Sequence, residues 1–190
     1  MARKKTLTAK KAPAKSNAKS AKAPASDGQA TASISGGEKL SGAQLNVLGQ
    51  FIKDLSFESP NSPNSLQGPG GNPKLEVNVN VQGRKHADDV YEVGLQFEAR
   101  ANNDDGVIYN IELVYAGLFR LTNIPENLLQ PALFIDCPAV LFPFLRRLVG
   151  DLTREGGFPP LYLDPIDFSA LYQQNITQAQ DSAAAPVANS

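Results

Sequence analysis

The chain has 190 residues, enough for one domain with tails, and its net charge of −1 comes from two unlike segments that cancel. Residues 1–40 hold nine basic residues against two acidic ones, a net charge of +7, whereas residues 41–190 hold nine basic against 17 acidic ones, a net charge of −8. An acidic body argues against nucleic acid as its partner and favours basic surfaces or cationic extended chains.

The cysteine content and the hydropathy predict a cytoplasmic protein. Cys137 is the single cysteine, so no disulfide framework is expected, which is typical of a reducing compartment. A small buried packing role is the favoured interpretation of this side chain, and a free reactive thiol is the alternative. No apolar run is expected to reach the roughly 18–20 residues that span a bilayer. The basic N-terminus is not followed by the apolar stretch of a secretory signal.

Both ends of the chain have the composition of tails. Residues 1–40 are rich in Ala, Lys, Ser, Pro and Gly, and so few large apolar side chains cannot offset the loss of chain entropy on folding, so we expect disorder. Such a lysine-rich tail either holds nucleic acid or another acidic surface, or serves as a solubilising extension. Residues 176–190 form a second expected tail. The folded domain is then expected over residues 45–175.

Four segments between the tails alternate apolar and polar residues with a period of two. They are residues 50–58, 74–82, 90–101 and 107–121. This alternation is typical of an antiparallel sheet with one buried face and one solvated face. Asn102–Gly106 (NNDDG) predicts a hairpin between the last two strands. The proline- and glycine-rich stretch 59–73 is too long for a tight turn, so we expect a mobile crossover loop.

The first strand assigns side chains to the two faces of the sheet. The apolar side is expected to hold Phe51, Leu55 and Phe57, and the solvated side Asp54, Ser56 and Glu58. Lys53 interrupts this alternation. Glu112 is expected on the solvated side of the fourth strand.

The last third of the chain predicts an irregular link and two helices. Residues 122–137 form the link. Apolar residues at spacings of three and four then mark a helix over 140–152, with Pro138 and Pro143 near its start and Gly156-Gly157 as its left-handed stop. Asp167 is the expected N-cap of a shorter second helix. The predicted fold is α+β: a four-stranded antiparallel sheet followed by two helices. The wide apolar stripe of the first helix suggests oligomerisation.

The sequence contains no catalytic constellation. His86 is the single histidine and lies in a predicted loop beside two aspartates, so a solvent-exposed or structural histidine is favoured over a base or a metal ligand. The glycines at 68, 70 and 71 lack the context of a phosphate-binding loop. We therefore expect a protein that is not an enzyme and that has no catalytic residue, metal or cofactor.

Five motifs in order resemble the SecB family of bacterial protein-export chaperones. They are Phe51–Asn61 (FIKDLSFESPN), Asp88–Leu95 (DDVYEVGL), Cys137–Phe144 (CPAVLFPF), Gly157–Leu161 (GFPPL) and Leu163–Tyr172 (LDPIDFSALY). The resemblance covers residues 45–175. It implies the α+β fold described above, assembled as a homotetramer that is a dimer of dimers, with the long helices between the dimers. It also implies that unfolded precursor proteins are held in hydrophobic grooves and delivered to the ATPase SecA.

The resemblance assigns three sets of residues. The contacts to SecA fall on Asp54, Glu58 and Glu112, and Asn110 stands where the family has a leucine. The candidates for the client groove are Phe57, Leu66, Leu75, Val77 and Tyr172, each of which is also compatible with ordinary core packing. The long helix implies an oligomer interface over Leu141, Phe144, Leu145, Leu148 and Leu152.

Two other functions remain open on the sequence. One is a SecB-like chaperone that controls a toxin–antitoxin pair instead of general precursors. The other is nucleic-acid binding through the lysine-rich tail, although no nucleic-acid partner and no membrane insertion are expected for the folded body.

Overall fold

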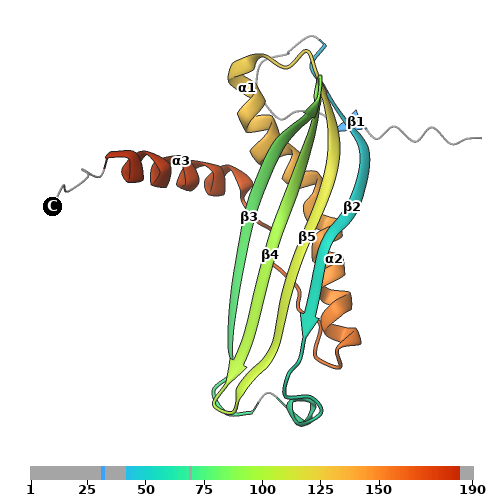
Figure 1. Cartoon of the computed structure of the whole chain (residues 1–190), viewed down its shortest axis with the longest axis vertical. Helices are drawn as coiled ribbons and strands as arrows, with labels where there is room; N and C mark the ends of the chain where they lie inside the picture. The colour runs from blue at the N-terminus through green and yellow to red at the C-terminus, as the bar shows by residue number, and fades with distance from the viewer. Residues whose placement is uncertain (1–30, 33–41, 69, 185–190) are drawn as a thin grey trace, which may run out of the picture.

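A computed structural model describes residues 31–32, 42–68 and 70–184, and its main element is an antiparallel sheet with the strand order β1-β2-β5-β4-β3 (Figure 1). The strands are β1 (Thr31–Ala32), β2 (Gln44–Glu58), β3 (Lys74–Ala87), β4 (Val90–Asn103) and β5 (Gly106–Thr122). The four long strands are those that the period of two predicts, and each is longer than its predicted segment. The predicted fold class is confirmed.

The tail predicted over residues 1–40 lies outside the described residues except for β1. The backbone of Thr31–Ala32 pairs antiparallel with Asn46 and Leu45 of β2. This two-residue strand therefore covers a short part of the free edge of the sheet. The sequence contains no signal for it, because two residues are too few for any periodicity.

Both hairpins have two-residue turns. The predicted NNDDG turn is confirmed, with Asn103 opposite Gly106 and Gly106 at a φ of +121°. The second turn, between β3 and β4, sets Ala87 opposite Val90. His86 was expected in a loop, but it lies in β3, at the irregularity between Lys85 and Ala87. The strand continues this far because the turn needs only Asp88 and Asp89.

Two irregularities in β2 change which face its residues occupy. The register slips between Val47 and Gly49 and again between Ile52 and Asp54. Lys53, which interrupts the alternation in the sequence, is the extra residue at the second slip. A bulge of this kind reverses the facing of the residues before it relative to those after it. Phe51 therefore pairs with Ala116, on the face opposite to Leu55 and Phe57, and the prediction that these three share one face is wrong.

The crossover loop links the two long edge strands of the sheet, β2 and β3. It contains a short 3₁₀ helix, Asn64–Gln67. At its far end the carbonyl oxygen of Gly71 accepts a hydrogen bond from the backbone N–H of Asp104 in the β4–β5 turn, at 3.2 Å. The predicted crossover is thus confirmed, and the loop passes over one end of the sheet (Figure 1).

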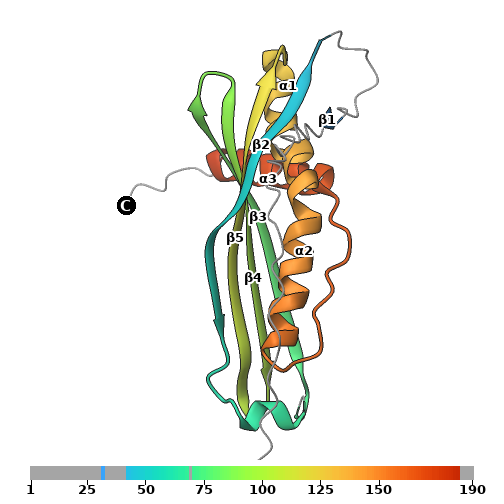
Figure 2. The same cartoon turned by 90° about the vertical axis from the view of Figure 1, so that its right-hand side faces the viewer.

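One long helical stretch covers one face of the sheet, which we call the inner face (Figure 2). It consists of α1 (Glu126–Pro131), a π-helical segment (Ala132–Asp136) and α2 (Cys137–Glu155). The irregular link predicted over 122–137 is therefore wrong from Glu126 onward. Pro143, expected at the start of the helix, lies inside α2. Its side chain is exposed, on a side where water can bond the carbonyl group that a proline leaves free.

The stretch Glu126–Glu155 is long and apolar enough to cross a membrane by length and composition alone. By that measure it reaches the length of a span, although Asp136, Arg146 and Arg147 interrupt the apolar run. In the structure, however, Leu141, Leu145 and Val149 from this stretch are fully buried in the core against the sheet. Core helices of soluble proteins can have the same length and composition, so these two properties are weak evidence for a membrane span.

Cys137 lies in this core and is fully buried. Its burial raises the pKa of the thiol well above the ordinary value, and the carboxylate of Asp136 adds to the shift. A thiol held in its protonated form is a poor nucleophile and a poor metal ligand. The packing role predicted for Cys137 therefore agrees with the structure.

The second helix, α3, spans Phe168–Ala184. The side-chain Oδ1 of Asp167 accepts hydrogen bonds from the backbone N–H groups of Ser169 and Ala170 at 2.9 and 3.0 Å, which confirms the predicted N-cap. The helix passes the boundary drawn at residue 176 for the C-terminal tail. It also packs on the π-helical segment and points away from the sheet (Figure 1), so the stretch from α1 to α2 provides most of the cover of the inner face.

Candidate functional site

The opposite face of the sheet, which we call the outer face, is polar and carries the three acidic residues predicted to contact SecA. The register sets Ser56 opposite Glu112 and Glu58 opposite Asn110, and Asp54 opposite Val114. Directly opposed residues of an antiparallel pair share a face, and Ile111 and Leu113 of β5 point into the core. Asp54, Glu58 and Glu112 are thus all exposed on the outer face, as their alternation predicts.

The charges on the outer face separate along its length. In the half near the β3–β4 turn, Glu92 forms ion pairs with Lys53 at 2.5 Å and with Arg84 at 2.6 Å. The hydrogen bonds from Lys53 and then Arg84 are the main cause of the lowered pKa of Glu92. Lys53 is the bulged residue of β2, so the bulge brings its amine to Glu92. In this half of the face the carboxylate is therefore paired, and two cations stand against one anion.

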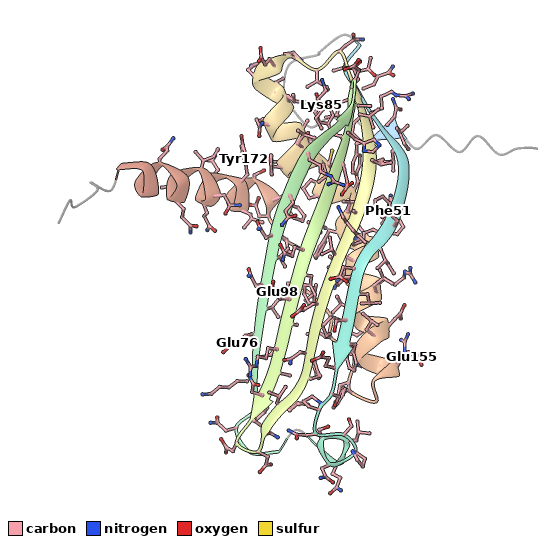
Figure 3. All side chains as sticks on the ribbon, in the orientation of Figure 1. Phe51, Glu76, Lys85, Glu98, Glu155 and Tyr172 are labelled. Carbon is pink, nitrogen blue, oxygen red and sulfur yellow. The ribbon has the colours of Figure 1, made fainter. Side chains whose placement is uncertain are left out.

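The other half of the outer face is acidic. Besides Asp54, Glu58 and Glu112 it holds Glu98 on β4 and Glu76 on β3, both in the half of the sheet away from Lys85 (Figure 3). None of the five carboxylates forms an ion pair with a residue that the structure describes. Such a surface attracts cationic segments electrostatically.

An apolar cavity of about 470 Å³ lies on the inner side, at the end of the sheet under the crossover loop. Its walls come from the loop, from the first residues of β3 and β5, from Ala101 near the end of β4, and from the segment that follows α2. The lining includes Leu66, Leu75, Ile108, Tyr109 and Phe158. Leu66 and Leu75 are 46% and 47% exposed, so large apolar side chains at the cavity remain open to solvent.

Three of the five groove candidates meet at this cavity. Leu66 and Leu75 line it, and the ring of Phe57 stacks on Tyr109, a lining residue, with ring centroids 5.9 Å apart. The other two do not. Val77 lies further along β3 and is 45% exposed. Tyr172 lies at the far end of the inner side, where it stacks on Phe134 at 6.0 Å (Figure 3).

The two glycines after α2 shape the cavity in different ways. Gly157 has a φ of +86°, the left-handed conformation predicted for the helix stop. Gly156 has an ordinary helical φ of −70°. A Cβ atom on Gly156 would lie 2.4 Å from the ring of Phe57, so this glycine is needed for the close approach of Phe57 rather than for the turn.

Thr153 fixes the segment that follows α2. Its fully buried hydroxyl lies 3.0 Å from the carbonyl oxygen of Val149, to which it donates, and accepts from the backbone N–H of Leu161 at 2.9 Å. This bond ties the returning segment, residues 156–167, along α2 (Figure 2). Phe158 at the start of the segment thereby reaches the cavity. The meeting of Phe158 and Tyr109 could not be predicted from the sequence, because it depends on long-range packing. The one local signal is the place of Tyr109 on the apolar side of its strand.

The structure corrects the interface predicted on α2. Leu141 and Leu145 are fully buried against the sheet of their own chain, so they have no surface to offer a second chain. Leu148 and Leu152 are half-buried and Phe144 is 42% exposed. Phe144 stacks on Tyr115 at 6.2 Å, beside Ile52 and Leu55 of the edge strand, which are 45% and 41% exposed. The apolar surface of α2 open to a partner is therefore the side near β2.

Comparison with known proteins gives a consistent result. The family model described as preprotein translocase subunit SecB matches residues 38–179. The protein-export protein SecB of Mesorhizobium japonicum is 47% identical over 165 residues, which is 86% of this chain and 98% of that protein. The SecB protein of a Bradyrhizobium species is 51% identical over 133 residues, which is 70% of this chain and 82% of that protein.

A solved structure shares the fold at much lower identity. It is the SecB-like chaperone of Mycobacterium tuberculosis in complex with a peptide from the HigA1 antitoxin, with a TM-score of 0.53 and 17% identity over 64% of this chain and 90% of that one. At this identity the likeness concerns the fold alone.

Proposed function

Because the chain belongs to the SecB family of protein-export chaperones, we propose that it binds unfolded precursor proteins at the cavity under the crossover loop and delivers them to SecA in the cytoplasm. The observation that carries the proposal is the separation of two surfaces on one sheet. An open apolar cavity lies on the inner side and an acidic half-face lies on the outer side. Such a chain can hold a client and a basic partner at the same time.

The cavity suits clients of varied sequence. Hydrophobic attraction has no direction, so an extended chain gains from burying any apolar side chain against Leu66, Leu75 or Phe158. Each buried side chain contributes roughly 1.5–3 kcal/mol. Because the lining is mostly apolar, with Ser65 and Lys74 as its polar side chains, the same walls can accept many segments. This property fits a chaperone that keeps precursors competent for translocation.

The outer face suits the delivery step. Asp54, Glu58 and Glu112 are exposed and lack a counterion among the described residues, so a basic surface of SecA would gain on-rate by electrostatic steering. Asn110 lies beside Glu58 and Glu112 in place of the family's leucine. The apolar part of the contact that a leucine would make is absent here, which leaves charge as the main attraction.

The relatives support export over the toxin–antitoxin alternative. The proteins that are 47% and 51% identical are named protein-export proteins, whereas the antitoxin-bound relative is 17% identical. We further propose a homotetramer in which the open side of α2, with Phe144, Leu148 and Leu152, faces a second dimer.

The cavity is tested by the double variant Leu66→Ser and Leu75→Ser. Both side chains are nearly half exposed, so the fold should survive, while an unfolded precursor should bind at least tenfold more weakly, a loss of about 1.4 kcal/mol. Fluorescence anisotropy of a labelled precursor measures the affinity.

The matched control is Leu48→Ser. Leu48 is also 47% exposed on an edge strand, but it lies at the end of β2 that is away from the cavity. This control should keep the affinity of the unmodified protein. Equal affinities for all three proteins would exclude the cavity as the client site.

A further inference from the structure

The acidic half of the outer face contains an arrangement that costs stability. Glu98 of β4 lies directly opposite Glu112 of β5. Both side chains are exposed, and like charges in directly opposed positions of a sheet repel. In the other half of the same face Glu92 has two counterions, Lys53 and Arg84. No described residue forms an ion pair with Glu98 or Glu112.

The neighbouring row of opposed residues contains a buried polar group without a hydrogen-bond partner among the described residues. Glu58, Asn110, Arg100 and Glu76 lie opposite one another across the four long strands. The side-chain oxygen of Asn110 is buried and has no hydrogen-bond partner among the described residues. Arg100 donates from Nε to the side-chain oxygen of Asn102 at 3.2 Å rather than pairing with either glutamate. A cation lying across these two rows would neutralise the carboxylates.

The chain itself carries such a cation source. Residues 1–30 contain eight basic residues and one acidic residue. The segment leads directly into β1, whose backbone pairs with Leu45 and Asn46 of β2. The segment thus joins the described chain at Thr31, at the β2 edge of the sheet whose outer face bears the unpaired carboxylates.

The length of residues 1–30 fits the distance from β1 to the acidic half of the outer face. From Asn46 to Ser56, the residue of β2 opposite Glu112, the strand runs ten residues, about 33 Å at roughly 3.3 Å per residue. A 30-residue chain reaches at most about 100 Å when fully extended and spans about 30 Å as a random coil, so residues 1–30 are long enough to reach this site. The local concentration of a tethered group is highest where its span matches the distance to the site.

We infer that the basic segment of residues 1–30 binds the acidic half of the outer face of its own chain, over Glu98, Glu112 and Glu76. A basic partner must then displace it. This second statement rests on the proposed function, because the residues predicted to contact SecA lie in the same half. The tail acts as a tethered competitor that raises the threshold for docking and leaves the client cavity free.

Zero-length carbodiimide crosslinking of the full chain tests the binding. Amide bonds should form between lysines of residues 1–30 and Glu98, Glu112 or Glu76, and mass spectrometry should place both partners in one chain when labelled and unlabelled proteins are mixed. The exposed Glu155, at the end of α2 (Figure 3), serves as the control carboxylate. The double variant Glu98→Gln and Glu112→Gln should lower the yield at Glu76 at least threefold. Equal yields at Glu155 and the outer face, or bonds only between chains, would overturn the inference.

A titration with an octalysine peptide tests the competition without SecA. A full-length variant with the eight basic residues of 1–30 changed to glutamine should bind the peptide at least tenfold more tightly than the unmodified chain. The advantage should shrink as salt is raised, because exposed charges are screened. Equal affinity in low salt would show that the segment does not occupy this face. Since neither experiment contains SecA, their failure is separate from a failure of the proposed delivery step.

Discussion

Glu92 is a nearly buried carboxylate that forms two ion pairs in one half of the outer face. It is 8% exposed, and a buried carboxylate without partners would be costly. Lys53 of β2 and Arg84 of β3 reach it along the outer face, from the strands on either side of β4. The contribution of Lys53 depends on the β2 bulge, so the interruption in the sequence alternation and the ion pair between Lys53 and Glu92 have one physical cause.

Changing Glu92→Gln should lower the free energy of unfolding by about 1–2 kcal/mol, because hydrogen bonds to a charged group are lost while Lys53 and Arg84 are exposed enough to regain water. The pKa of Glu92 is lowered in the folded state. Its stabilising effect is therefore present above the ordinary glutamate pKa, about 4.3, and is lost as the pH falls through the folded value. Urea unfolding at pH 7 and below pH 4 should show the difference from the unmodified protein shrinking with acid.

The control for that experiment is Glu98→Gln. It makes the same chemical change on the same strand, at an exposed residue without an ion pair in the described part of the chain, and it removes a like-charge contact with Glu112. No loss of stability is expected. A loss equal to that of Glu92→Gln would show that the ion pairs are not the cause.

Among the helices, strands and turns, the sequence predicts those features that depend on short-range pattern. The strands follow from alternation, the turn from NNDDG and the start of α3 from the cap at Asp167. The side of β2 occupied by Phe51 could not be predicted, because a bulge is detected only against the partner strand. The helical stretch before Cys137 could not be predicted, since Pro131 is typical of an irregular link and yet lies inside this stretch.

The returning segment, residues 156–167, depends on one hydroxyl. Thr153→Val keeps the shape of the side chain but removes the acceptor for the N–H of Leu161, a loss of about 1–3 kcal/mol. Hydrogen exchange of the Leu161 amide should become at least tenfold faster, which corresponds to about 1.4 kcal/mol. Thr153→Ser keeps the hydroxyl and should keep the amide protected. Equal protection in both variants would mean that the hydroxyl does not hold the segment.

The candidate site was predicted only in part, for the same reason. Asp54, Glu58 and Glu112 share a face because alternation along two strands sets it. The cavity joins the crossover loop, β3, β4, β5 and the segment after α2, and no local pattern reveals that these distant stretches meet. The family resemblance groups Tyr172 with Leu66 and Leu75, although Tyr172 stacks on Phe134 away from the cavity. Leu141 and Leu145 were grouped with Phe144, because the stripe of a helix does not say which part its own sheet covers.

The whole molecule exposes apolar surface along the β2 side of α2, and we expect that surface to hold a tetramer together. Leu148→Glu would place a charge without a partner in such an interface, at a cost of several kcal/mol. Light scattering should then report dimers in place of tetramers. Ile176→Glu, at a side chain of α3 that is 39% exposed, is the control and should leave the mass unchanged. A tetramer in both variants would place the interface elsewhere.

The separation of client cavity and partner face is tested most directly by the triple variant Asp54→Ala, Glu58→Ala and Glu112→Ala. These changes remove exposed charge and no core volume, so the fold and the cavity should survive. Titration of SecA, with binding of an unfolded precursor measured in parallel, should show at least tenfold weaker affinity for SecA, a loss of about 1.4 kcal/mol, and unchanged affinity for the precursor. Unchanged affinity for SecA, or parallel loss of both, would contradict two separate surfaces.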